Sequence, residues 1–145
     1  MALVERSVLV GYSAEQMFRL VDRVEDYPQF LPWCGGSSVQ GREAGAVTAT
    51  VVIDFRGVRQ SFTTRNSRRE PESIEVQLVD GPFRRLEGSW NFRPLGESAC
   101  KVEFRLQYEF SNRILDKLLS PVFGHIANTF VDAFVKRAEQ VHGRQ

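Results

Sequence analysis

Apolar and polar residues alternate with a period of two through most of the chain between Ser38 and Phe110. The clearest run extends from Cys100 to Phe110, where every second residue is apolar and the residues between are charged or polar. Such alternation is typical of antiparallel strands with one buried and one solvated face. The turn sequences Arg56-Gly57, Gly81-Pro82 and Pro94-Leu95-Gly96 separate the runs and predict hairpins between successive strands.

The spacing of apolar residues changes to that of a helix on both sides of this region. Ser13 and Gln16 have the spacing of a capping box, and an apolar stripe follows over residues 17–24. After the strands, Asn112 is expected to cap one or two helical turns, which Pro121 then breaks or kinks. A continuous apolar stripe over residues 122–141 predicts a helix of about five to six turns.

The order of these elements predicts the fold class. A strand over residues 3–10 precedes two short helices, the second beginning at Pro28 and ended by Pro32. Six antiparallel strands and the long amphipathic helix complete the order. It is that of an α+β helix-grip fold, in which a curved antiparallel sheet wraps around a long C-terminal helix. Repeats, low-complexity segments and linkers are absent from the sequence, so we expect a single domain over residues 1–145.

Composition and charge narrow the functional classes. The 145-residue chain has a net charge of +1, which provides no general field for nucleic acid or an anionic membrane. Cys34 and Cys100 match no metal-binding or redox spacing and suit a reducing compartment. The first six residues do not resemble a signal peptide, and no stretch approaches the length of a membrane span. We expect a cytoplasmic protein, with peripheral attachment at the inner membrane as the alternative.

The segment Asp26–Cys34 concentrates two prolines and three aromatic rings in nine residues. Two interpretations are open: the rings are plugs at a structural corner, or they form the rim of a cavity for an apolar ligand. The second interpretation predicts that Trp33 is partly exposed at the mouth of the cavity, because the indole N–H of a tryptophan needs a partner when it is buried.

A curved sheet holds its helix away from its deepest surface, and the predicted result is a largely apolar cavity between the two. The candidate ligand-binding residues are those whose side chains are expected to line it. They are Phe30, Leu31, Trp33, Phe62, Thr64, Phe83, Trp90, Phe104, Tyr108, Phe123, Ile126 and Phe130. Thr64 and Tyr108 are the polar groups expected to face inward. The alternative is that the aromatic rings fill the space completely.

The predicted cavity contains no arrangement that favours catalysis. His125 lies among polar residues of the long helix, and His142 lies near its end. No nucleophile–base pair and no metal triad can be assembled from these positions, so we expect a binding protein with no catalytic residue, metal or required cofactor.

Three segments carry a resemblance to a known family. The stretch Val21–Cys34, the sequence Gly81-Pro82-Phe83 with the following strand, and the helix beginning at Phe123 resemble a START-like family related to polyketide cyclases. This family contains the coenzyme Q-binding proteins of mitochondria and bacterial ribosome association toxins. The resemblance covers essentially the whole chain and implies a helix-grip fold with a tunnel.

The resemblance implies two functions and a third alternative. The first is binding of ubiquinone, another polyprenyl quinone or a lipid as a carrier or chaperone in respiration, with contact at a membrane surface. The second is binding to the large ribosomal subunit, which would block its association with the small one. The third is a cyclase-like enzyme. For the ribosome, the candidate phosphate contacts are Arg65, Arg68, Arg69, Arg84 and Arg85, which we expect to lie on neighbouring strand ends and loops.

Overall fold

The computed structural model describes residues 2–143 and shows one seven-stranded antiparallel sheet with a long helix against it. The strand order is β1-β7-β6-β5-β4-β3-β2, a meander to which the first strand adds at the β7 edge. The strands are β1 (Ala2–Val10), β2 (Cys34–Glu43), β3 (Ala46–Phe55), β4 (Val58–Arg69), β5 (Ser73–Asp80), β6 (Phe83–Pro94) and β7 (Cys100–Phe110). The helix-grip class is therefore confirmed.

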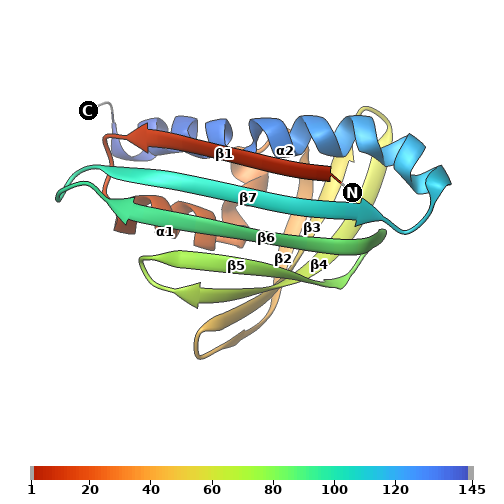
Figure 1. Ribbon diagram of the computed structural model, residues 1–145, viewed down its shortest axis with the longest axis horizontal. Helices are drawn as coiled ribbons and strands as arrows, with labels where there is room; N and C mark the ends of the chain where they lie inside the picture. Colours follow the sequence, from red (N-terminus) through yellow and green to blue (C-terminus); the bar gives the residue numbers. More distant parts are fainter. Residues whose placement is uncertain (1, 144–145) are drawn as a thin grey trace.

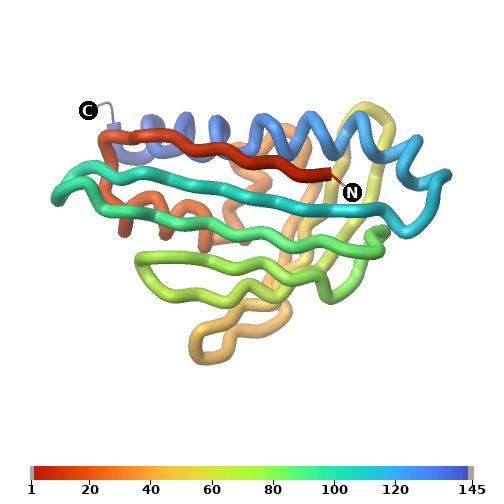
Figure 2. Tube along the Cα trace, viewed as in Figure 1, coloured from red at the N-terminus to blue at the C-terminus, as the bar shows by residue number. Residues whose placement is uncertain are grey.

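The sheet is strongly bent around the helix α2 (Arg113–His142). Figure 1 shows β2, β3 and β4 running at a steep angle to β1, β7 and β6, and Figure 2 shows the same bend in the chain trace. β1 and α2 lie side by side, and the Arg6 guanidinium joins them by donating to the Asn128 carbonyl and to the Asp132 carboxylate. The concave face of the sheet thus meets the apolar stripe of α2.

The predicted period-two runs are strands with the expected inner and outer faces. In β7 the apolar residues are buried, while the residues between them are half-buried or exposed. The hairpin between β3 and β4 turns at Arg56 and Gly57, whose φ angles are 52° and 79°. Both positive angles are those of a type I′ turn, which suits the twist of a two-residue hairpin.

The short helices α1 (Ala14–Asp22) and η1 (Val24–Gln29, a 3₁₀ helix) lie between β1 and β2. The capping box of α1 is confirmed, because Ser13 Oγ accepts from the Gln16 amide and Gln16 Oε1 accepts from the Ser13 amide. The expected start of the second helix at Pro28 is wrong, since η1 begins four residues earlier. A 3₁₀ turn leaves its first amides without intrahelical partners, so Val24 starts the helix as readily as a proline.

Of the two predicted effects of Pro121, the kink is correct and the break is wrong. α2 is one helix of 30 residues that includes Pro121, and its first turns lie at an angle to the rest (Figure 1). A proline removes one helical hydrogen bond, and here it lies on the exposed side of the helix, where water can satisfy the freed carbonyl.

The expectation that no stretch approaches a membrane span is also corrected. α2 is long and apolar enough to cross a membrane by length and composition. Part of its apolar surface packs on the sheet in this structure, with Val131, Phe134 and Ala138 among its most deeply buried residues. A core helix of this length passes the same test, so length and composition alone do not make α2 a membrane span.

Candidate functional site

A cavity separates the middle of α2 from the concave face of the sheet. It holds about 830 Å³ of space free of protein atoms, counting its open mouth, and about 100 Å³ is open to the centre of a water molecule. One water molecule needs about 10–15 Å³ of space open to its centre, and the cavity has several times that volume. The aromatic rings therefore do not fill the interior completely. The lining residues are Val21, Val24, Tyr27, Trp33, Ala49, Val51, Ile53, Phe62, Thr64, Asn66, Ile74, Val76, Leu86, Gly88, Trp90, Phe104, Leu106, Phe123, Ile126, Ala127 and Phe130.

The sheet register places the inward residues of neighbouring strands beside one another. Ala49 of β3 pairs with Thr64 of β4, and Trp90 of β6 pairs with Phe104 of β7. Because side chains alternate between faces along a strand, every second residue of each strand contributes to the cavity wall. One face of α2 supplies the opposite wall, including Phe130, whose ring centroid lies 5.6 Å from that of Trp90.

The structure brings eight of the expected ligand-binding residues together on the cavity wall. Trp33, Phe62, Thr64, Trp90, Phe104, Phe123, Ile126 and Phe130 line the cavity. The other four expected residues do not line it. Phe30 packs between Tyr27 and Phe134 with the Arg137 guanidinium over its ring, and Leu31 is buried in the core.

Phe83 and Tyr108 occupy a separate aromatic cluster near the first turns of α2. The ring centroids of Tyr108 and Phe123 are 4.6 Å apart in an edge-to-face arrangement. Those of Phe83 and Phe110 are 5.0 Å apart, and these two rings are stacked. Both face inward as predicted, but the cavity ends before it reaches them, because Phe62 and Phe123 meet at 6.2 Å between the two regions. Phe83 lines a second, much smaller apolar pocket on the other side of this pair.

The expectation that Trp33 is partly exposed is wrong. Trp33 is 6% exposed, and its ring packs at 6.0 Å from that of Phe130 on the cavity wall. The residue directly precedes β2, whose first residue Cys34 pairs with Ile53 of β3. Trp33 therefore points under α2 instead of lying at the rim.

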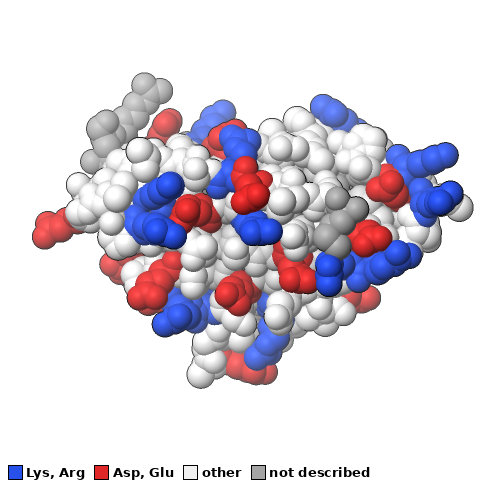
Figure 3. Space-filling model, in the orientation of Figure 1, with Lys and Arg blue, Asp and Glu red and all other residues white. Residues whose placement is uncertain are grey.

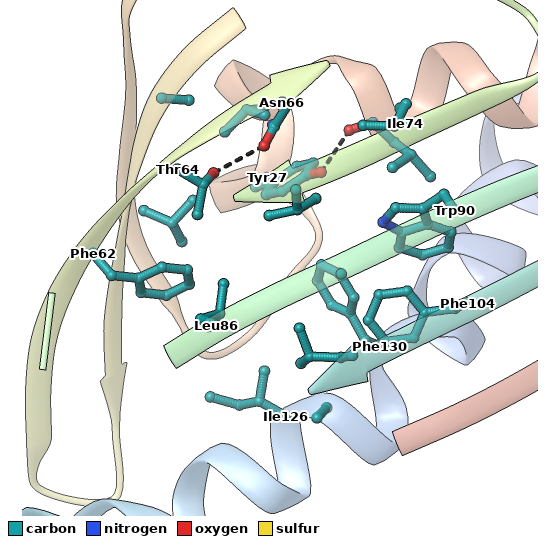
Figure 4. Close-up of a pocket in the computed structure, with 18 of the residues that line it drawn as sticks. Tyr27, Phe62, Thr64, Asn66, Ile74, Leu86, Trp90, Phe104, Ile126 and Phe130 are labelled. Carbon is teal, nitrogen blue, oxygen red and sulfur yellow. Dashed lines mark hydrogen bonds between the residues drawn. The ribbon is translucent and has the colours of Figure 1, made fainter. Parts of the chain in front are cut away.

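Of the polar groups on the cavity wall, sequence reasoning found Thr64 but missed the Tyr27 hydroxyl and Asn66. Tyr27 was expected only as an aromatic ring, and Asn66 was not singled out at all. Thr64 Oγ1 donates to Asn66 Oδ1 at 2.9 Å, and Tyr27 Oη donates to the carbonyl of Val21 (Figure 4). The signal for Asn66 was available in the period of β4, because it lies two residues after Thr64 and therefore on the same face.

The electrostatics of the cavity are those of a neutral site. Among the residues of the described chain that line it, none carries an ionisable acid or base apart from Tyr27. Burial, together with the nearby Asp22, raises the pKa of Tyr27 far above its usual value, so its hydroxyl stays protonated at any physiological pH. The cavity wall thus offers neither a general base nor a counter-ion.

None of the histidines and cysteines, all of which the structure describes, lines the cavity. His125 is exposed and stacks on Phe55 at 5.6 Å, and His142 lies beside Tyr12. Burial raises the pKa of the Cys34 thiol and that of Cys100, the latter to about 11. Within residues 2–143 no group of three His, Cys, Asp or Glu side chains is placed to hold a metal ion.

The arginines proposed for the ribosome do not form one patch. Each is paired with a carboxylate: Arg65 with Glu43, Arg68 with Asp22, Arg69 with Glu72, Arg84 with Glu109 and Arg85 with Glu87. The register places Arg69 level with Asn91 of β6, six residues and therefore roughly 20 Å along the strand from Arg85. The face seen in Figure 3 likewise carries basic and acidic side chains interspersed. The expected shared cluster is wrong.

Comparison with known proteins places the chain in a family. The family model described as "Polyketide cyclase / dehydrase and lipid transport" matches residues 10–135. The ribosome association toxin RatA of Vibrio cholerae is 46% identical over 143 residues, covering 99% of each chain. The mitochondrial coenzyme Q-binding protein COQ10 homolog B of Xenopus laevis is 31% identical over 144 residues, covering 96% of this chain and 59% of its own length.

Solved structures agree with the fold. The ZhuI aromatase/cyclase from Streptomyces sp. R1128 superposes with a TM-score of 0.84 at 15% identity, covering 96% of this chain and 94% of that one. At this identity the likeness extends to the helix-grip architecture and not to the chemistry. The family model over residues 10–135 and the relatives at 46% and 31% identity show that this chain belongs to the START-like family of polyketide cyclases, dehydrases and lipid transport proteins.

Proposed function

We propose that the protein binds a neutral hydrophobic ligand, a polyprenyl quinone or another lipid, in the cavity between α2 and the sheet. The observation that carries the proposal is the combination of an unfilled cavity with a wall that is apolar and uncharged over the described residues. Burying apolar surface contributes about 25 cal/mol per Å², so such a wall favours a ligand with extended apolar area. The relative named as a coenzyme Q-binding protein supports a quinone as the occupant.

The proposal is for a carrier or chaperone and not for an enzyme. Acid–base catalysis needs a group that exchanges protons near neutral pH and lies beside the bound substrate. Tyr27, the ionisable residue of the wall, is held protonated by its burial and by the nearby Asp22. The cyclases among the structural neighbours share the fold at low identity, which does not carry their activity to this chain.

Lipids extracted from the protein purified from its native host test this proposal directly. We expect mass spectrometry to find a hydrophobic molecule that co-purifies in stoichiometric amounts. In an Ala49→Leu variant the added side chain projects from β3 into the cavity and should exclude that molecule. The matched control is Ala44→Leu, which adds the same atoms at an exposed position outside the cavity. Wild-type protein without any bound lipid, together with failure to bind added quinone, would reject the proposal.

Association with the large ribosomal subunit is the second candidate function. It is favoured by the identity of 46% to a RatA toxin over 99% of both chains. Because phosphate contacts release counterions, such binding should weaken steeply as salt rises. Arg69 and Arg84 are suitable positions for charge reversal, since both are well exposed, at 81% and 64%.

Sedimentation with purified large subunits across a salt series distinguishes the two candidates. Loss of binding in Arg69→Glu or Arg84→Glu, with the cavity empty in the native protein, would favour the ribosomal function over the carrier. Arg68→Glu is not suitable, because Arg68 is largely buried against Asp22 and the substitution would disturb the fold.

A further inference from the structure

Some hydrogen-bond donors of the cavity wall have acceptors among the described residues of the protein, and others do not. The Tyr27 hydroxyl proton is donated to the Val21 carbonyl, and the Thr64 hydroxyl proton is donated to Asn66. Both protons are therefore engaged within the protein. The indole N–H groups of Trp33 and Trp90 are different. Both residues line the cavity and are buried, at 6% and 3% exposed, yet neither N–H donates a hydrogen bond within residues 2–143.

The free N–H of Trp90 faces the cavity. Every buried side-chain nitrogen or oxygen of the described residues that is closed to water-sized space has a partner. The Trp90 nitrogen has none, so water-sized space must reach it, and the cavity is the space that Trp90 lines. In Figure 4 the nitrogen lies on the side of the indole ring toward Tyr27 and Thr64, which line the cavity.

Neighbouring rings hold the indole in this orientation. Its centroid lies 4.6 Å from that of Phe104 and 5.4 Å from that of Phe134, with the Phe134 ring edge-on. The Phe92 ring is stacked parallel to it at 6.1 Å. A donor fixed in this way does not lose side-chain freedom when it forms a hydrogen bond with a ligand.

We propose that the Trp90 indole N–H donates a hydrogen bond to a carbonyl oxygen of the bound ligand, and that this bond selects the ligand class. The proposal rests on the proposed function of the same cavity and deepens it. A wall with an unused donor and no charged group favours a neutral apolar compound that carries an acceptor, such as a ring ketone or quinone. It disfavours a plain hydrocarbon and also a fatty acid, whose carboxylate would have no cation beside it.

A pair of probes of the same shape tests this selection. 2,3-Dimethyl-1,4-naphthoquinone carries two carbonyls, and 2,3-dimethylnaphthalene has none. The methyl groups block the quinone positions at which thiols would add. One neutral hydrogen bond corresponds to an affinity ratio of about 2- to 10-fold. We expect the wild-type protein to prefer the quinone by such a ratio, and the preference to disappear in Trp90→Phe and persist in Trp33→Phe.

An NMR measurement on the wild-type protein gives a second readout that needs no variant to bind. The chain has two tryptophans, so a ¹H–¹⁵N spectrum has two indole signals, which the two Phe variants assign. The quinone should move the Trp90 indole proton downfield, as hydrogen bonding does, whereas the hydrocarbon should move it only through ring proximity.

The outcomes separate the two proposals. Equal binding of the two probes, or equal weakening of both by Trp90→Phe, would overturn the role of Trp90 and leave the hydrophobic site in place. Loss of the preference in Trp33→Phe alone would move the donor to Trp33. Binding of neither probe would overturn both the donor assignment and the proposed function.

Discussion

Arg68 and Asp22 form a two-bond ion pair, with Nε 2.6 Å from Oδ1 and Nη2 2.8 Å from Oδ2. Their side chains are 21% and 15% exposed, and the guanidinium also lies 5.6 Å from the centre of the Phe18 ring. Asp22 ends α1, directly after Val21 on the cavity wall, and Arg68 lies on β4. The pair therefore links the end of α1, next to the cavity wall, to strand β4 of the sheet.

We predict that Arg68→Ala lowers the free energy of unfolding by about 1–3 kcal/mol. This range lies between the values for exposed and fully buried pairs, as the partial burial requires. Urea unfolding of Arg68→Ala, Asp22→Asn and the double variant gives the coupling energy. Arg65→Ala is the matched control, because its pair with Glu43 is exposed and should contribute less than about 1 kcal/mol. Equal losses at both positions would contradict this role of the pair.

A second prediction concerns the contact that ends the cavity. Phe62→Ala removes the ring that meets Phe123 and should connect the cavity with the small apolar pocket beyond it. We expect the affinity for a quinone with three isoprene units to rise relative to that for a quinone with one, because the longer tail gains buried area. Isothermal titration of both ligands measures the ratio. Phe55→Ala, which removes a ring stacked on His125 outside both spaces, should leave the ratio unchanged.

The environment of Trp33 gives a third prediction. In a Trp90→Phe background Trp33 is the single indole, and its burial predicts emission at short wavelength with little quenching by iodide, which stays in water. A quinone that enters the cavity should quench the same emission. The urea-unfolded variant provides the reference for full iodide access. Strong iodide quenching in the folded state would return Trp33 to the rim of the cavity.

The fourth prediction concerns stability at alkaline pH. Burial raises the pKa of Cys100 to about 11, so the unfolded chain loses this thiol proton at a lower pH than the folded chain does. Unfolding then releases a proton, and the free energy of unfolding should fall by roughly 1–3 kcal/mol between about pH 9 and pH 11. The raised pKa values of Tyr27 and Tyr108 act in the same direction. Urea titrations of the wild type and Cys100→Ala should show a smaller fall in the variant; parallel curves would exclude Cys100 as a source.

The strands and the cavity wall they form could be predicted because the period of two is strong. In β4, β6 and β7 it places Phe62, Thr64, Trp90 and Phe104 on the inner face, and the structure finds them there. The alternation along a strand predicts which face a side chain lies on, but it does not predict where along that face the cavity ends. Tyr108 has the same inward direction as Phe104 but lies beyond the point where Phe62 and Phe123 close the space.

Long-range pairing explains the other misses. Arg68 belongs to a cluster of arginines in the sequence, and its partner Asp22 is 46 residues away, so no local pattern distinguishes it from a solvated neighbour. Trp33 was expected at the rim because an indole N–H usually needs a partner, yet the fold places the ring under α2. Both errors arise from tertiary contacts that sequence spacing does not contain.

The position of α2 after all seven strands has a consequence for synthesis. β1 pairs with β7 across about a hundred residues of chain, and α2 supplies the last wall of the cavity. During translation the concave apolar surface therefore stays uncovered until residues 113–142 have emerged. Such late, non-local closure slows folding and exposes nascent chains to aggregation. Under the proposed function, a hydrophobic ligand present at that moment would cover part of this surface before α2 does, and its binding would then also favour folding of the chain.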